Sequence, residues 1–193
     1  MPQNILKNKS SQIDLSVYIK SFLLLMKPRV MSLVLFTAMV GLLVAPVTVS
    51  FTTASLSLLA VAIGSGAAGA LNMWYESDVD AIMSRTCLRP IPTGKVKREQ
   101  ALLFGIILSF ISIVMLYLSS NLISALLLAA TISFYFFIYT IWLKRKTAQN
   151  IVIGGAAGAL PPVIGWTVAM NNISIEPVIM FLHFLPSSVG QLQ

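Results

Sequence analysis

Residues 51–80 read FTTASLSLLAVAIGSGAAGALNMWYESDVD, and this stretch decides the fold. Residues 51–71 carry no charged side chain, and about 20 mostly apolar residues are enough to cross a bilayer as a helix. The residues that follow, 72–80, carry the carboxylates of Glu76, Asp78 and Asp80. The stretch therefore predicts a transmembrane helix that ends in an acidic segment at the membrane edge.

The composition of the whole chain agrees with a membrane protein. Of its 193 residues, 57% are hydrophobic and 10% are charged, and the mean hydropathy is +0.88. A soluble domain carries about 25% charged residues, so lipid rather than water is the expected solvent. The net charge of +7 does not indicate nucleic-acid binding, because the basic residues lie in short segments between apolar runs. That arrangement favours a lipid bilayer as the partner.

Five stretches are long and apolar enough, or nearly so, to span a membrane as helices. They are residues 30–49, 51–71, 101–118, 122–143 and 151–170. A sixth begins near Pro177. The sequence thus predicts an all-α fold, a polytopic transmembrane helix bundle with five full spans and an incomplete sixth.

The basic residues predict the orientation of the bundle. All 13 Lys and Arg residues lie before the first span, between the second and third, or between the fourth and fifth. The loops near Pro46, Asn121 and Asn171 contain none. Cytoplasmic loops carry an excess of Lys and Arg, so the N terminus and the acidic segment are both expected on the cytoplasmic side.

The acidic segment is the strongest candidate for chemistry. Asn72, Glu76 and Asp80 are spaced four residues apart, which places them on one face of a helix. Clustered carboxylates repel one another, and oxygen ligands of this kind suit Mg²⁺. Asp78 points elsewhere and is a candidate for a second metal position.

Arg85 and Arg89 follow this segment directly, and guanidinium groups suit phosphate oxygens. Carboxylates and arginines beside an apolar cavity would suit an amphiphilic substrate with a diphosphate head and a hydrocarbon tail. Spacing alone leaves a second interpretation open, in which this is a hydrated loop whose charges pair with one another.

Three longer segments carry a resemblance to a known family. They are MKPRV at 26–30, GALNMWYESDVDAIMSRTCLRPIPTG at 69–94 and YTIWLKRKTAQNIVIGGAAGALPPVIGW at 139–166. With them the chain resembles the UbiA-type intramembrane prenyltransferases, and within these the branch that converts protoheme IX into heme O. The resemblance covers about residues 21–182. Glu76 stands where many bacterial members have Asp, and Ala148 replaces a frequent Pro.

The resemblance implies a nine-helix fold in the cell inner (plasma) membrane. It also implies transfer of a farnesyl group from farnesyl diphosphate to a vinyl group of protoheme IX. Heme A synthase and a complementing C-terminal chain are candidate protein partners. Carried over residue by residue, it gives Asn72, Glu76 and Asp80 catalytic and Mg²⁺-binding roles, and it places Arg85, Arg89 and Lys144 on the diphosphate.

The sequence also departs from the family. Residues 1–20 are expected to be a cytoplasmic tail and residues 21–182 the N-terminal part of the membrane domain. Residues 183–193 look unrelated to the family, and we expect an aberrant, out-of-frame tail there. The family's second aspartate-rich motif does not occur in these 193 residues, so we expect little transferase activity from this chain alone.

Three alternatives stay open at this point. The first is another UbiA-type aromatic prenyltransferase, acting on 4-hydroxybenzoate or a chlorin, and the second is an inactive remnant. The third is a small transporter or channel with an acidic gate. A transporter would place charged or polar groups inside its spans, and the spans here are almost free of charge.

Overall fold

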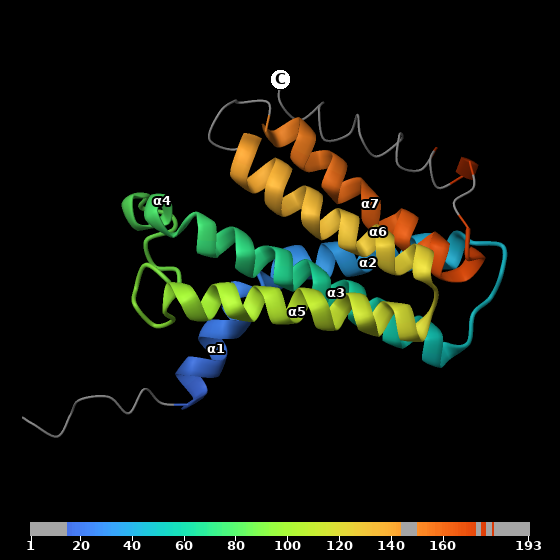
Figure 1. The fold of residues 1–193 in the computed structure, drawn as a ribbon, viewed down its shortest axis with the longest axis horizontal. Coiled ribbons are helices and arrows are strands. Elements are labelled where there is room, and N and C mark those ends of the chain that lie inside the picture. The colour runs from blue at the N-terminus through green and yellow to red at the C-terminus, as the bar shows by residue number, and fades with distance from the viewer. Residues whose placement is uncertain (1–14, 144–149, 173–174, 177–178, 180–193) are drawn as a thin grey trace, which may run out of the picture.

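The structure, a computed structural model, describes residues 15–143, 150–172, 175, 176 and 179, and all regular structure within them is helical. Figure 1 shows the helices packed as an elongated bundle. In chain order they are α1 (Leu15–Leu25), α2 (Pro28–Val44), α3 (Phe51–Tyr75), α4 (Ser77–Ile82), α5 (Arg98–Ser119), α6 (Leu122–Ser133), the π-helix η1 (Phe134–Leu143) and α7 (Asn150–Met170).

Helix α3 is the central helix of the bundle. It is buried along most of its length, whereas α5 and the α6–η1 helix are mostly exposed. Its run of Gly and Ala residues is the reason, because small side chains let neighbouring helices approach closely. At Gly66 a Cβ atom would lie 2.5 Å from the end of the Met26 side chain, and at Gly64 it would lie 3.0 Å from Leu128. These positions allow α1 and α6 to pack directly on α3.

The first predicted span is a bent pair of helices. Helices α1 and α2 meet at an angle of 50°. Helix α1 begins at Leu15, inside the segment expected as an N-terminal tail, and Pro28 is the first residue of α2. Between them Lys27 adopts a left-handed backbone conformation, with φ 53° and ψ 68°. Proline suits the first turn of a helix but cannot continue the preceding one, so the bend falls at this position.

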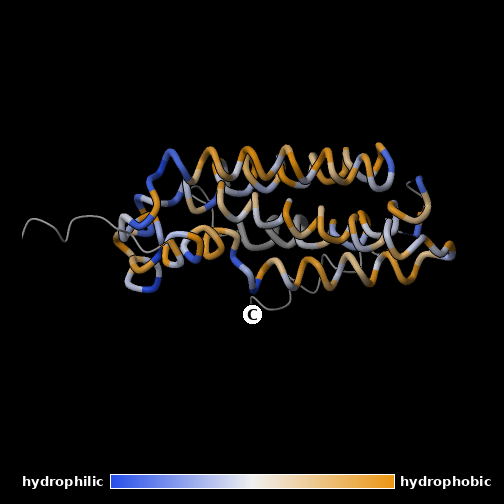
Figure 2. The backbone as a smooth tube through the Cα atoms, turned by 90° about the horizontal axis from the view of Figure 1, so that it is seen from below, coloured by the Kyte–Doolittle hydropathy of each residue, from blue (hydrophilic) through white to orange (hydrophobic). Residues whose placement is uncertain are grey.

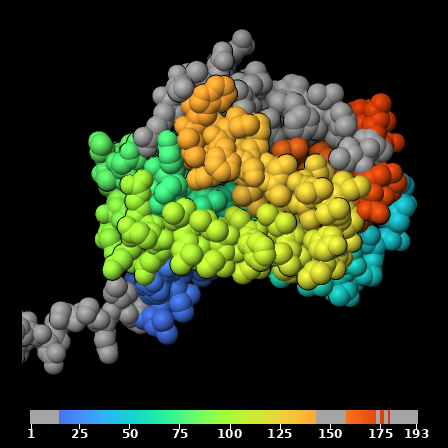
Figure 3. All heavy atoms as spheres, in the orientation of Figure 1, coloured from blue at the N-terminus to red at the C-terminus, as the bar shows by residue number. Residues whose placement is uncertain are grey.

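The apolar helices agree with a multi-pass membrane protein. Within the described residues, α3, α5 and the joined α6–η1 helix are each long and apolar enough to cross a bilayer, and the bent α1–α2 pair passes as one further span. The face in front in Figure 3 is formed by α5 and α6. The exposed residues of α5 include Leu103, Ile106 and Phe110. In a bilayer these side chains face lipid.

The all-α membrane fold predicted from the sequence is confirmed, with boundaries within a few residues of the expected ones for most spans. The predicted span 151–170 corresponds to α7. The segment after Pro177, where a sixth span was expected, lies almost wholly outside the described residues. The number of complete spans therefore stays a prediction.

Helices α2 and α7 touch through their backbones. A Cβ atom on Gly165 would lie 2.0 Å from the carbonyl oxygen of Ala38, and one on Gly41 would lie 2.0 Å from that of Pro162. Both distances are shorter than any tolerated contact, so only glycine fits at either position. The two glycines face each other's helix and set how closely the helices approach.

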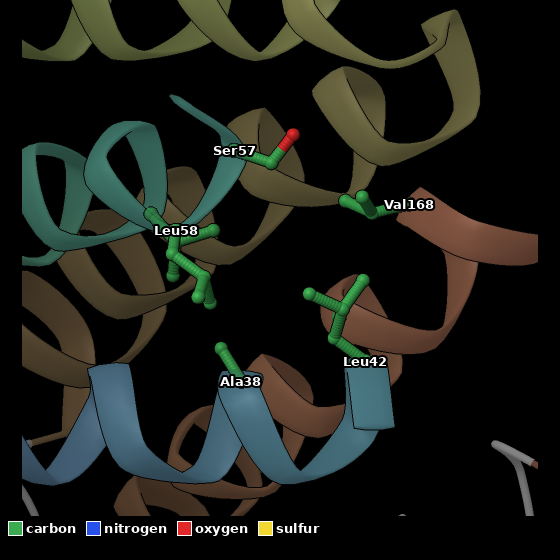
Figure 4. A pocket seen from close by; sticks show the side chains of 7 residues that line it. Ala38, Leu42, Ser57, Leu58 and Val168 are labelled. Atoms are coloured by element: carbon green, nitrogen blue, oxygen red, sulfur yellow. The ribbon is translucent and has the colours of Figure 1, made fainter. Parts of the chain in front are cut away.

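Two features occupy the end of the bundle away from α4. Asn121 caps α6 through the Ser124 N–H at 2.8 Å and donates to the Thr167 carbonyl at 2.8 Å, which ties the α5–α6 turn to α7. A small apolar hollow, too narrow to hold a water molecule, lies between α2, α3 and α7. Figure 4 shows Ala38, Leu58 and Val168 among the side chains around it. Within the described residues no charged group lines this hollow, so we assign it to packing.

The α2–α7 contact predicts a difference between two glycines of the same helix. Replacing Gly165 by Ala forces the helices apart, and we expect a loss of about 1–3 kcal/mol of stability. Replacing Gly158 by Ala is the matched control, because a Cβ there meets no atom of the described residues within 4 Å. That change should be neutral or slightly stabilising, since Ala favours helices over Gly.

Thermal unfolding of both variants in the same detergent, followed by size-exclusion chromatography, measures the difference. Equal unfolding temperatures for Gly165→Ala and wild type would contradict the backbone contact.

Candidate functional site

The acidic residues form one buried row where α3 passes into α4. Asn72 is 1% exposed, Glu76 9% and Asp80 3%. Glu76 separates the two helices, with φ −90° and ψ 4°. Its N–H nevertheless donates to the Asn72 carbonyl at 3.1 Å, and the Asp80 N–H donates to the Glu76 carbonyl at 2.8 Å. Helical hydrogen bonding thus continues through the break, and the spacing of four residues keeps the three side chains on one face.

This row lies at the polar end of the bundle. Figure 1 shows α4 beyond the end of α3, beside the segment that leads into α5. Figure 2 shows hydrophilic stretches gathered at the same end, with hydrophobic residues along the helices. Arg98, at the start of α5, lies over the ring of Trp74 with its guanidinium carbon 5.5 Å from the ring centroid. This cation–π contact fixes the start of α5 against the end of α3.

Asp80 is paired with Arg89. The Nη1 atom of Arg89 donates to both carboxylate oxygens of Asp80, at 2.8 Å to Oδ1 and 2.7 Å to Oδ2. The Thr86 hydroxyl donates to the Asp80 carbonyl at 3.1 Å, and the Arg89 N–H donates to the Thr86 carbonyl at 3.0 Å. The turn after α4 therefore returns the guanidinium to the carboxylate. The pair is partly solvated, because the Arg89 side chain is 27% exposed.

Asn72 is held from two sides. The Lys27 ammonium, at the bend between α1 and α2, donates a hydrogen bond to Asn72 Oδ1. The Asn72 amide nitrogen donates to the hydroxyl of Thr140 on η1, at 3.3 Å. Segments from three parts of the sequence thus meet at the amide. Its oxygen faces a positive charge and its nitrogen faces a buried hydroxyl.

The other predicted residues lie apart from this row. Asp78 is exposed, because it projects from the outer face of α4. Arg85 is also exposed, and among the described residues no hydrogen bond or ion pair joins it to the acidic row. Lys144 lies outside the described residues. The structure therefore brings together Asn72, Glu76, Asp80 and Arg89, and it leaves Asp78 and Arg85 on the outside of the turn.

The donor set suits a hard divalent cation. It comprises one amide oxygen and two carboxylates, which are the ligands that Mg²⁺ takes together with water and phosphate oxygens. In the described part of the chain no three His, Cys, Asp or Glu residues gather into a metal site of their own. A cation here would depend on the Asn72 oxygen and on oxygens from water or a ligand. Arg89 contacts Asp80 and Lys27 contacts Asn72, so positive charge already lies on the row.

Comparison with known families identifies the family of this chain. The model of the UbiA prenyltransferase family matches residues 34–191. This chain belongs to the UbiA prenyltransferase family. The acidic row of this UbiA protein lies within the matched residues, as do Arg89 and Thr140.

The chain is similar to proteins named protoheme IX farnesyltransferase. A protein named protoheme IX farnesyltransferase from Pelagibacter ubique (strain HTCC1062) is 64% identical over 178 residues, which are 92% of this chain and 58% of that protein. One of the same name from Rhodopseudomonas palustris (strain BisB18) is 58% identical over 163 residues, 84% of this chain and 52% of that protein. The chain thus spans between half and three fifths of the length of these relatives.

A solved structure supports the fold independently of sequence identity. A UbiA homolog from Archaeoglobus fulgidus, described as bound to DMAPP and Mg²⁺, superimposes on the UbiA chain with a TM-score of 0.74. The match covers 86% of this chain and 60% of that one, at 19% sequence identity. At this identity the likeness concerns the fold alone.

Two residues of the site were missed by the sequence analysis. Lys27 was noted only as part of a family segment, and Thr140 was noted in the same way. They reach Asn72 from 45 and 68 residues away along the chain. The signal for Lys27 was a lysine placed directly before the proline that starts a span. For Thr140 the sequence carried no signal, since a threonine within an apolar helix commonly bonds its own backbone.

The Asp80–Arg89 pair gives a stability prediction. Replacing Arg89 by Leu leaves a buried carboxylate without its cation, and we expect a loss of about 2–4 kcal/mol. Adding Asp80→Asn should recover more than half of that loss, because the charge that needed a partner is gone. Arg85→Leu is the matched control and should change stability by about 0.5 kcal/mol or less, as exposed positions do.

Reversible unfolding of wild type and these three variants in mixed micelles tests the prediction. If the single and double variants at Arg89 were equally destabilised, charge pairing would not be the interaction that matters.

Proposed function

We propose that this UbiA protein carries the acidic, diphosphate-binding part of a protoheme IX farnesyltransferase. The reaction is the transfer of a farnesyl group from farnesyl diphosphate to a vinyl group of protoheme IX, which gives heme O. The observation that carries the proposal is the buried row of Asn72, Glu76 and Asp80 at the polar end of an apolar bundle. The names of relatives 50–64% identical support the choice of substrates.

Asn72, Glu76 and Asp80 would hold Mg²⁺ through their side-chain oxygens, with Asp78 as a candidate for a second position. When bound, the cation would neutralise the diphosphate and stabilise charge on it as it leaves. The solved relative described with DMAPP and Mg²⁺ supports this choice of cation. The buried position of the row supports it as well, because positive charge next to buried carboxylates lowers the cost of keeping them ionised.

The basic residues would bind the diphosphate. Arg89 already lies on the acidic row, and Arg85 is exposed one turn before it and is able to meet a ligand from outside. Lys144 completes the predicted set. Lys27 joins it as a residue that the structure adds, since its ammonium lies on Asn72. Positive groups arranged before the reaction stabilise the leaving group without further reorganisation.

The reaction then needs an apolar, dry environment beside this polar end. The C–O bond of the allylic diphosphate breaks and the electron pair leaves with the diphosphate. The electron-rich vinyl group attacks the allylic carbon, and water adds to the new cation and loses a proton to give the hydroxyethyl product. Apolar helix walls would hold the farnesyl chain and keep water from the allylic cation before the vinyl group reacts.

The location proposed for the chain is the cell inner membrane, with the N terminus and the acidic row on the cytoplasmic side. The distribution of the 13 basic residues supports this orientation. Protoheme IX and farnesyl diphosphate are the proposed small-molecule partners. Heme A synthase and a complementing chain are proposed protein partners. The names of the relatives do not favour another aromatic prenyltransferase, and the nearly uncharged spans do not favour a transporter.

A chimera tests the proposed function directly. This chain replaces the aligned segment of the Pelagibacter ubique relative, and the product is expressed in bacteria that lack their own heme O activity. We expect heme O in extracted membranes, and we expect chelation of Mg²⁺ to abolish its formation in vitro. Asp80→Asn should lower the rate by about a hundredfold or more, because the charge of a metal ligand is lost.

Glu99→Gln serves as the control, since this carboxylate is exposed in the first turn of α5 and has no proposed role in the site. A chimera that inserts into the membrane but makes no heme O, while the unaltered relative does, would overturn the proposal.

A further inference from the structure

Thr140 occupies an unusual position in the bundle. It is fully buried, on the π-helix η1 that continues α6 toward the polar end. Its hydroxyl makes two hydrogen bonds, donating to the Tyr135 carbonyl at 2.9 Å and accepting from the Asn72 amide nitrogen at 3.3 Å. The buried hydroxyl of Ser124, at the start of α6, instead forms its hydrogen bonds at the other end of the bundle, with Asn121 and Thr167.

The directions of these bonds fix the Asn72 amide. An ammonium has three donors and no acceptor, so Lys27 contacts an oxygen and not a nitrogen. The hydroxyl of Thr140 has one hydrogen, and that hydrogen is used on the Tyr135 carbonyl. The hydroxyl therefore accepts from the amide nitrogen of Asn72. Only one of the two orientations of the amide satisfies both neighbours, and it turns Oδ1 away from Thr140.

The π-helix explains how Thr140 reaches Asn72. A π-helix bonds residue i to residue i+5, so each wide turn holds one residue more than an α-turn and shifts later side chains by up to about 100° around the axis. The Thr140 hydroxyl bonds the carbonyl five residues earlier, which is consistent with this wider turn. Such turns are rare and are frequently found at functional sites.

We propose that Thr140 is a positioning residue, which holds the Asn72 amide with its oxygen toward the Lys27 ammonium and away from the Thr140 hydroxyl. This rests on the proposed function, because the oxygen matters only where a cation or the Lys27 ammonium binds it. Thr140 itself touches neither metal nor substrate. Its hydroxyl accepts a hydrogen bond from the Asn72 amide nitrogen. Rotating the amide by half a turn would break this bond and the bond from Lys27, so the Asn72 oxygen stays in the orientation in which it can bind a cation.

Three variants of the full chain separate this role from simple packing. Thr140→Val keeps the shape and removes the hydroxyl, and Thr140→Ser keeps the hydroxyl and removes the methyl group. Thr131→Val is the matched control, because its hydroxyl donates only to the Leu127 carbonyl of its own helix, at 2.7 Å. If Thr140→Val does not give folded protein, Thr140→Cys replaces it with the same expectations, since a thiol is a weak acceptor.

The first readout is the Asn72 side-chain NH₂ signal in ¹⁵N-asparagine-labelled protein without metal, assigned by its loss in Asn72→Ser. We expect Thr140→Val to shift this signal and to speed exchange of its protons with water. Thr140→Ser should restore both, and Thr131→Val should change neither. An Asn72 signal that is the same in Thr140→Val and wild type would overturn the inference.

The second readout is the affinity for Mn²⁺, a paramagnetic probe for Mg²⁺, measured by electron paramagnetic resonance. We expect Thr140→Val to weaken binding by about fivefold or more, as loss of a buried hydrogen-bond partner suggests, with recovery in Thr140→Ser. Unchanged affinity in folded Thr140→Val would also overturn the inference. If wild type itself binds no Mn²⁺, the proposed metal role fails, and the metal-free signal still decides whether Thr140 orients the amide.

Discussion

Negative charge buried at the end of an apolar bundle needs a cation in contact with it, and the structure around the site depends on this requirement. Asp80 is almost fully buried, and the guanidinium of Arg89 lies on both of its oxygens. The turn after α4 is arranged to return Arg89 to this position, with Thr86 bonded to the Asp80 backbone. One structural unit, made of the end of α3, α4 and the turn after α4, stabilises the buried Asp80 carboxylate.

That unit can be built only because α3 is central. Its small residues let α1, α5 and α6 approach closely, and the helix extends beyond its apolar part far enough to carry Asn72 into the same environment. A helix on the outside of the bundle would place the same residues at the lipid headgroups, where their charges would be hydrated. The glycines and alanines of α3 therefore create the buried environment in which the carboxylates that follow them are held.

The sequence predicted the helices well and the site in part. Apolar runs of about 20 residues bounded by lysine and arginine locate spans reliably, because the bilayer imposes both length and charge distribution. The spacing of Asn72, Glu76 and Asp80 predicted a common face, since four residues make about one helical turn. Lys27 and Thr140 were not predicted, because their contacts depend on a left-handed residue and a π-helix. Neither conformation has a pattern of its own in the sequence, and both arise from packing between distant segments.

The left-handed backbone of Lys27 links the bend between α1 and α2 to the hydrogen bond on Asn72. A residue with a side chain pays about 1–2 kcal/mol for this conformation, which glycine would adopt freely. Glycine would ease the joint between the first two helices, but it would remove the ammonium from Asn72. The angle between α1 and α2 and the electrostatic balance at Asn72 are therefore both set by one residue, and a substitution of Lys27 that changes one also changes the other.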